Sequence, residues 1–175
     1  MSLPHRDLAT EELWVFSLLI YSKANVKEIC LYWQDKFGAN VNIMLLLLWC
    51  DAQQVTLTEQ HIKRLQKVIA HWNENYTTRL RALRISAAAE KLPKAAADKI
   101  KKSLLSAELE LERVEQAMLT ATLYQLDSLT EANSTKTAAA QKGNLYTYIA
   151  LLTPTPYAAH LKQIHDLNQI VEQLG

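Results

Sequence analysis

Eight apolar residues in succession, Ile43 to Cys50, constrain the fold of this chain more than any other feature. A helix that is apolar on all sides must be surrounded by other elements. The run is far shorter than the roughly 20 residues that cross a bilayer. It follows directly on a polar cluster that contains Gln34, Asp35, Gly38, Asn40 and Asn42. We therefore expect a central buried helix at 43–50, beside polar groups that must find hydrogen-bond partners.

The rest of the chain favours helix, because it has only three glycines and four prolines and is rich in strong helix formers. Apolar residues at helical spacing predict further helices at about 11–23, 25–37, 59–90, 94–129, 144–152 and 157–174. We expect an all-α, single-domain bundle of about six helices over residues 1–175, with a long antiparallel hairpin at 59–129. An exposed loop is expected at 130–143, and a C-terminal helical appendage packed on the bundle at 144–175.

Several helix ends can be placed from single residues. Thr10 is expected to cap the first helix, which we interpret as mostly buried, with Trp14, Leu18 and Tyr21 along one face. Asn25 with Glu28 three residues later resembles a capping box for the second helix. At its other end Gly38 suits the left-handed residue that follows a helix. Asn40 is expected to cap the third helix, and Pro93 to separate the two long ones.

Composition excludes little about function. The formal net charge is +1, so no global field attracts nucleic acid or membrane. Cys30 and Cys50 lie in apolar patterns and are expected to be buried thiols. The N-terminal sequence lacks the features of a signal peptide and no transmembrane segment is expected, so we expect a cytoplasmic protein. No glycine-rich phosphate loop or metal-ligand spacing is found, and we expect no metal site and no cofactor.

The polar cluster can form the floor of a binding site. That floor would consist of Gln34, Asp35, Asn40 and Asn42, with walls from Trp14, Tyr21 and Trp49. Asp35 would then be the candidate catalytic acid or base. Two alternatives stay open for Asp35, because helical spacing places it opposite the apolar face: it is exposed to water, or it is paired structurally.

Charge is strongly segregated along the two long helices. The segment from Arg79 to Lys102 carries eight cations and two acids, a net charge of +6, whereas Glu108 to Glu131 carries −5. The basic patch, at the expected hairpin end, consists of Arg79, Arg81, Arg84, Lys91, Lys94, Lys99, Lys101 and Lys102. Three acids, Glu108, Glu112 and Glu115, follow one another at helical spacing. We expect this acidic track to line a partly wet groove and to pair with arginines or lysines.

The segments LWVFSLLIY, VKEICLYWQDKFGANVNIMLLLLW, LRALR and AELELERVEQ, in this order, resemble a family of bacterial proteins, domain of unknown function 2390. The most specific part is QD-x-x-G-x-x-VN, here Gln34, Asp35, Gly38, Val41 and Asn42. The resemblance implies a bacterial cytoplasmic setting and directs attention to Gln34, Asp35 and Asn42. It implies no activity.

The leading hypothesis is a non-enzymatic module that holds a protein partner, because charge is segregated and no catalytic constellation is apparent. The first alternative is a small-molecule site or enzyme around Gln34, Asp35 and Asn42. The second is binding of an anionic partner or nucleic acid by the basic patch. A homo-oligomer stays open.

Overall fold

A computed structural model describes residues 6–126 and 143–174 of the 175-residue chain. It is all-α throughout these residues: α1 (Arg6–Tyr21), α2 (Val26–Phe37), α3 (Val41–Ala52), α4 (Glu59–Trp72), a π turn η1 (Asn73–Thr77), α5 (Thr78–Ala89), α6 (Lys94–Leu123), α7 (Asn144–Leu152) and α8 (Ala158–Glu172). Because α4, η1 and α5 follow one another without a gap, they form one long rod. The predicted helical class is confirmed. The predicted loop at 130–143 falls outside the described residues except for Gly143.

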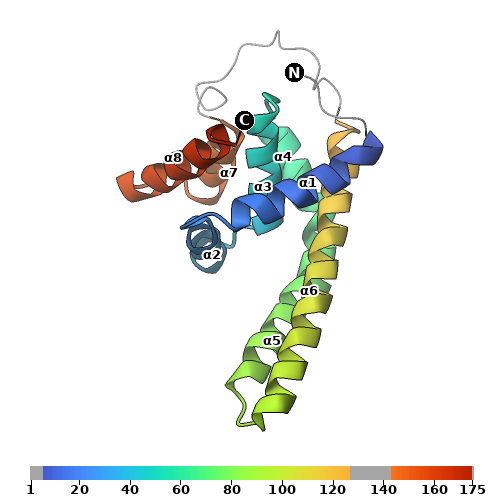
Figure 1. Ribbon diagram of the computed structural model, residues 1–175. Helices are drawn as coiled ribbons and strands as arrows, with labels where there is room; N and C mark the ends of the chain where they lie inside the picture. The colour runs from blue at the N-terminus through green and yellow to red at the C-terminus, as the bar shows by residue number, and fades with distance from the viewer. Residues whose placement is uncertain (1–5, 127–142, 175) are drawn as a thin grey trace.

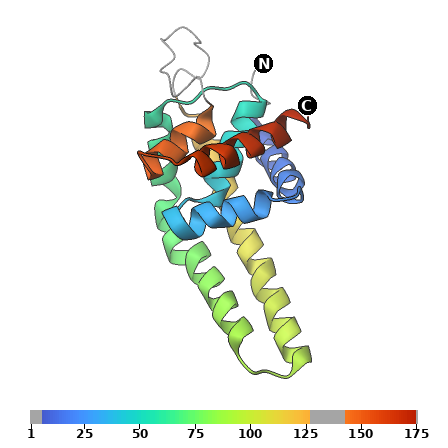
Figure 2. The same cartoon turned by 90° about the vertical axis from the view of Figure 1, so that its left-hand side faces the viewer.

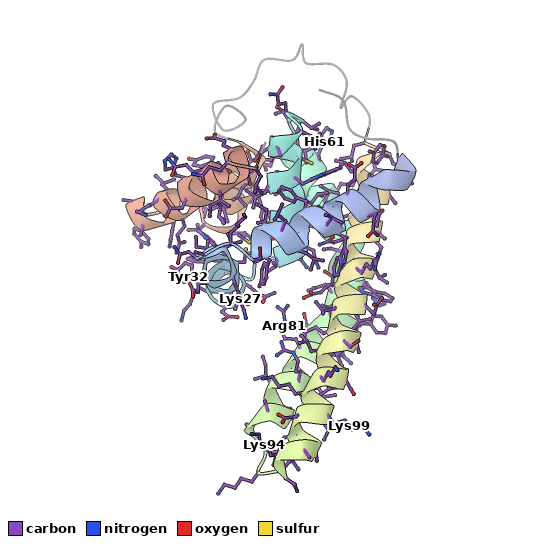
Figure 3. All side chains as sticks on the ribbon, viewed as in Figure 1. Lys27, Tyr32, His61, Arg81, Lys94 and Lys99 are labelled. Carbon is purple, nitrogen blue, oxygen red and sulfur yellow. The ribbon has the colours of Figure 1, made fainter. Side chains whose placement is uncertain are left out.

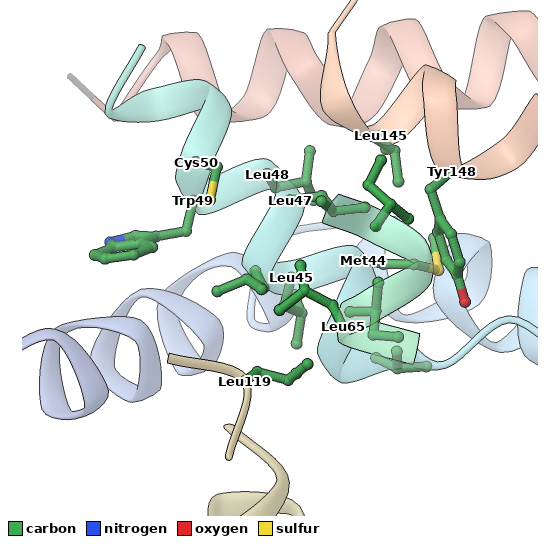
Figure 4. Packing of buried hydrophobic residues seen from close by; sticks show 14 of the residues in the cluster. Met44, Leu45, Leu47, Leu48, Trp49, Cys50, Leu65, Leu119, Leu145 and Tyr148 are labelled. Carbon is green, nitrogen blue, oxygen red and sulfur yellow. The ribbon is translucent and has the colours of Figure 1, made fainter. Parts of the chain in front are cut away.

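The central helix is α3. Each residue from Val41 to Cys50 is buried, and α3 packs against α1, α2, α6, α7 and α8. Figure 4 shows side chains such as Met44, Leu45 and Leu48 leaving α3 in different directions, each toward a neighbouring helix. The prediction of a buried helix at 43–50 is therefore confirmed.

The ends of α2 and α3 follow from two residues and contradict one expectation. Gly38 ends α2 in the left-handed conformation, with φ of 67°. Asn40 caps α3, since its Oδ1 accepts a hydrogen bond from the Ile43 N–H at 3.0 Å. The expected capping box at Asn25 is wrong: Asn25 has φ of 67° and makes no side-chain cap. The turn between α1 and α2 is short, and Asn tolerates the left-handed conformation that this turn requires.

Helix α1 differs from the prediction in its start and in its buried face. It begins at Arg6, so Thr10 is no cap; its hydroxyl instead lies 2.7 Å from that of Thr120 on α6. The buried residues are Ala9, Leu13, Ser17 and Ile20. Val15, Leu18 and Leu19 are exposed, because neighbouring helices cover α1 along one side only.

Helix α7 is held by polar contacts at its first residue. The backbone N–H of Asn144 donates to Asp51 Oδ1 at 3.0 Å. The Asn144 side chain donates to Val55 O and accepts from the Leu57 N–H, both at 2.7 Å. Val55 and Leu57 are the two buried residues of the loop between α3 and α4, and Asn144 thus satisfies one backbone group of each.

The long hairpin projects from the packed body of the molecule (Figures 1 and 2). We call residues 78–110, which comprise α5 and the first half of α6, the arm, and the remaining helices the head. The head covers only the C-terminal half of α6. No residue of α5 is buried, so the arm is a two-helix unit with little core of its own.

Candidate functional site

A buried carboxylate lies where the arm joins the head. The Glu115 side chain on α6 is fully buried, at 0% exposure, and accepts four hydrogen bonds. Oε2 accepts from Asn40 Nδ2 at 3.1 Å and Asn42 Nδ2 at 2.9 Å. Oε1 accepts from Asn73 Nδ2 at 2.9 Å and Thr77 Oγ1 at 2.5 Å. We call these five residues the Glu115 cluster; its four donors replace the water that a buried carboxylate loses.

The π turn explains how one helix supplies two of these donors. Asn73 and Thr77 stand at the two ends of η1, and the wider π turn brings both side chains onto the same oxygen of Glu115. Single π turns inside α-helices are rare and often lie at functional sites. Next to the turn, the Trp72 ring stacks on Tyr76 with centroids 4.6 Å apart, and Trp72 Nε1 donates to Leu111 O at 3.3 Å.

A second group of side chains surrounds Arg81 on α5. Its Nε donates to Glu108 Oε1 and its Nη2 to Glu112 Oε1, both at 2.8 Å. Its Nη1 donates to Gln34 Oε1 on α2. Arg84 adds hydrogen bonds to Glu108 from Nε and Nη2. In Figure 3, Arg81 extends from the arm toward α2. We call Gln34, Arg81, Arg84, Glu108 and Glu112 the Arg81 cluster; it joins α2, α5 and α6.

The two acids that contact Arg81 have pKa values shifted in opposite directions by their surroundings. Burial alone would raise the pKa of Glu108, but hydrogen bonds from Arg84 and Arg81 hold that pKa below its ordinary value. The pKa of Glu112 is raised by burial, and its single arginine contact with Arg81 offsets this only in part. Glu108 is therefore a firmly ionised anchor, and Glu112 takes up a proton more readily.

The hydrogen bonds continue into α1. Gln116 Nε2 donates to Asn42 Oδ1 and to Ser17 Oγ, both at 3.0 Å. Asn42 therefore uses its amide group toward Glu115 and its carbonyl toward Gln116. This chain of contacts fixes α1, α3 and α6 relative to one another.

A small cavity lies between the two clusters. It has a volume of about 20 Å³ and is lined by Gln34, Asn40, Val41, Asn42, Asn73, Thr77, Thr78, Arg81, Glu112 and Glu115. That volume accommodates one water molecule. Within residues 6–126 and 143–174, no group of three or more His, Cys, Asp or Glu side chains comes together in a way that could hold a metal ion.

The structure brings together three of the residues proposed for the polar floor and leaves the fourth apart. Gln34, Asn40 and Asn42 line the cavity, whereas Asp35 is exposed and does not. The proposed walls also lie elsewhere. Trp14 stacks against the Arg113 guanidinium, with Arg113 Cζ 5.5 Å from the centroid of the ring. Trp49 lines a separate, open apolar groove of about 380 Å³. Burial raises the pKa of Tyr21 to about 12, but Tyr21 does not line the cavity.

The basic patch divides into two parts. Arg81 and Arg84 are half-buried and paired with Glu108 and Glu112 of the acidic track. The expected arginine or lysine partner of Glu115 is wrong, because three asparagines and a threonine contact it instead. The six remaining cations are exposed on the arm: Arg79, Lys91, Lys94, Lys99, Lys101 and Lys102. Figure 3 shows Lys94 and Lys99 at its far end.

Sequence reasoning missed Asn73, Thr77, Ser17 and Gln116. A pair of polar residues four apart, Asn73 and Thr77, inside an otherwise amphipathic helix was the available signal. The π turn that aims both at one acceptor has no such signal, because it depends on a carboxylate 38 residues further along the chain.

Comparison with protein families matches residues 12–119 to the model described as protein of unknown function (DUF2390). The matched segment contains every residue of the Glu115 cluster and of the Arg81 cluster. No curated protein and no solved structure matches the chain.

Proposed function

Because the chain belongs to the DUF2390 family, whose description assigns no activity, we propose a function from its geometry. The protein is a non-enzymatic interaction module of the bacterial cytoplasm. It binds a protein partner through the arm, and the head holds the arm in a fixed orientation.

One observation carries this proposal: the arm exposes large aliphatic side chains on a unit that has only two helices. Leu83 is 53% exposed and Ile85 59%, with Leu92, Ile100, Leu105 and Leu109 between 39% and 41%. Single exposed aliphatics are ordinary. Here six of them share one projecting hairpin, and a concentration of exposed apolar side chains on one element favours a binding role. A partner that packs on the arm would supply the core that two helices cannot build.

The polar cavity supports the same proposal by its size. Pockets that bind small molecules measure roughly 300–1,000 Å³, whereas this one measures about 20 Å³. The carboxylate of Glu115 and the guanidinium of Arg81 already form hydrogen bonds with other side chains of this chain. Because these polar side chains form their hydrogen bonds with one another, the arrangement favours a structural role at the junction of arm and head.

The setting is proposed from the cysteines and the family resemblance. Cys30 and Cys50 are both free and buried, and unpaired thiols suit a reducing compartment. None of the described helices is long and apolar enough to cross a membrane.

In-cell photo-crosslinking tests the proposal. A photoreactive amino acid is placed at Leu83 or Ile85 on the arm and, as a control, at Val68, which is 38% exposed on α4. We expect discrete adducts with another protein from the arm positions and none from Val68. Equal adduct patterns from all three positions, or no adduct from either arm position, would refute a binding role for the arm.

A further inference from the structure

One side of α6 is covered by the head at one end and uncovered toward the tip of the arm. A single row of residues, three or four positions apart, marks this side: Gln116, Glu112, Leu109, Leu105, Lys101, Asp98 and Lys94. Such spacing places them along one face of the helix. Gln116 contacts Ser17 of α1, and Glu112 pairs with Arg81 below α2. Beyond Glu112, Leu109 and Leu105 are 39% and 41% exposed.

Helix α1 shows how a helix packs on this side of α6. Three side-chain pairs join them where α1 crosses the C-terminal part of α6: Glu11 with Arg113, Ser17 with Gln116, and Thr10 with Thr120. None of the described residues continues this packing toward the tip. On the neighbouring helix, Ile85 follows Arg81 by four residues, so it lies on the same side of the arm and is 59% exposed.

We call Ile85, Leu109, Leu105, Lys101 and Lys94 the arm face. From Leu109 to Lys94 it runs 15 residues, or about 22 Å at the rise of an α-helix. That length matches about four turns of a helix laid along it.

Charge indicates the chemistry of the partner. Lys94 and Lys101 lie in the row itself, with Lys102 beside it, against one acid, Asp98. Over the whole arm there are six exposed cations and three exposed acids. Arg81 and Arg84 are not counted, because they pair with Glu108 and Glu112. A partner whose polar flanks carry Glu or Asp complements this surface.

Shape favours a helix over a flat surface. At its upper end the arm face stops where Gln34 of α2 contacts Arg81, and α2 stands out from the head beside the arm (Figure 1). Leu109 lies one turn before Glu112, close to where α2 meets the arm. A flat bilayer could reach the tip of the arm but not this recessed end of the arm face, whereas a helix fits along the arm below α2.

From these observations, and resting on the function proposed above, we propose that the arm face binds an acidic amphipathic helix of a protein partner. The bound helix completes a three-helix bundle with α5 and α6. Its apolar side contacts Ile85, Leu105 and Leu109, and its acidic flank contacts Lys94 and Lys101.

The test uses the full-length protein and a display library of 18-residue helical peptides with randomised surfaces. We expect the selected peptides to carry an apolar stripe flanked by Glu or Asp. Their affinity should fall at least tenfold with Leu105→Ser/Leu109→Ser and with Lys94→Glu/Lys101→Glu. It should stay unchanged with Val68→Ser, the matched exposed aliphatic on α4. Thermal unfolding of each variant shows whether the fold is kept, and all these positions are exposed.

Three outcomes would overturn the assignment: no peptide is recovered, the selected peptides ignore both double substitutions, or vesicles of anionic phospholipid or a DNA duplex bind with the same dependence on the arm face. Adducts at Leu83 in cells together with any of these results would leave the proposed function standing and refute the arm face alone.

Discussion

Asn73 and Thr77 donate hydrogen bonds to the same atom, Oε1 of the buried Glu115, from the two ends of one π turn. This relationship joins the π turn directly before the arm to the C-terminal part of α6. With Asn40 and Asn42 on the other oxygen, it connects three segments that are far apart in the chain. The cluster therefore sets the position from which the arm leaves the head.

Replacing the central carboxylate should destabilise the protein strongly. Glu115→Gln puts an amide N–H₂ where two donors now point, so buried donors lose their acceptor. We expect a loss of about 2–4 kcal/mol in the free energy of unfolding, measured by urea denaturation. The control is Glu110→Gln, an exposed acid on the same helix, which should change it by less than about 0.5 kcal/mol. Equal effects of the two substitutions would contradict a structural Glu115 cluster.

A smaller loss is expected when one donor is removed with little change in shape. Thr77→Val deletes the hydroxyl that donates to Glu115 Oε1 at 2.5 Å, and three other donors remain. The expected cost is about 1–2 kcal/mol, again from urea denaturation. Thr56→Val, at an exposed threonine, serves as the control. A Thr77→Val protein as stable as wild type would show that this hydrogen bond contributes nothing.

The sequence was sufficient to predict the helical architecture but not the hydrogen bonds at the junction of arm and head. The apolar run at 43–50 identified the central helix, because eight successive apolar residues can only be buried. Gly38 and Asn40 located the adjoining helix ends through local chemistry. On α1 the predicted face was right only in part: Tyr21 packs against the core, whereas Leu18 is exposed and the small side chains Ala9 and Ser17 lie in the interface instead.

The candidate site was recovered in part for a similar reason. Asn40 and Asn42 were noticed because they adjoin the apolar run. Asn73 and Thr77 were not, because their role requires a π turn and an acceptor on another helix. Asp35 stood out in the sequence next to Gln34, yet one step along a helix rotates a side chain by about 100°, which leaves Asp35 in water.

The core prediction compares one leucine of α3 with one of the arm. Leu47 is fully buried and Leu83 is 53% exposed. Leu47→Ala should cost about 2–5 kcal/mol, since it leaves a cavity in the packed centre, whereas Leu83→Ala should cost less than about 0.5 kcal/mol. Thermal or urea unfolding of both variants measures this. A large loss at Leu83 would mean that the arm contributes to the core after all.

Stability should depend on pH through Asp51. Burial raises the pKa of Asp51 to about 6 from 3.8, so the folded protein holds this proton more tightly than the unfolded chain does. The resulting stabilisation is complete below about pH 3.8 and is lost as the pH rises to about 6. It amounts to about 3 kcal/mol at most.

The test is Asp51→Asn, which keeps an oxygen for the Asn144 N–H. Its stability relative to wild type should improve by up to about 3 kcal/mol between pH 4 and pH 7. Asp98→Asn on the arm, an exposed carboxyl, controls for the change in net charge. A constant difference between wild type and Asp51→Asn over this range would contradict the buried, proton-binding Asp51.

The central claim is that the Glu115 cluster is structural and that the arm is the binding surface. The most direct test places a photoreactive residue at Ile85 and measures the yield of the adduct with the partner per folded molecule. The yield is compared in three backgrounds: the otherwise wild-type protein, Thr77→Val and Leu105→Ser/Leu109→Ser. We predict an unchanged yield with Thr77→Val and loss of the adduct with the double substitution on the arm. Loss of the adduct with Thr77→Val and its retention with the double substitution would contradict the account and place the binding site at the polar cavity.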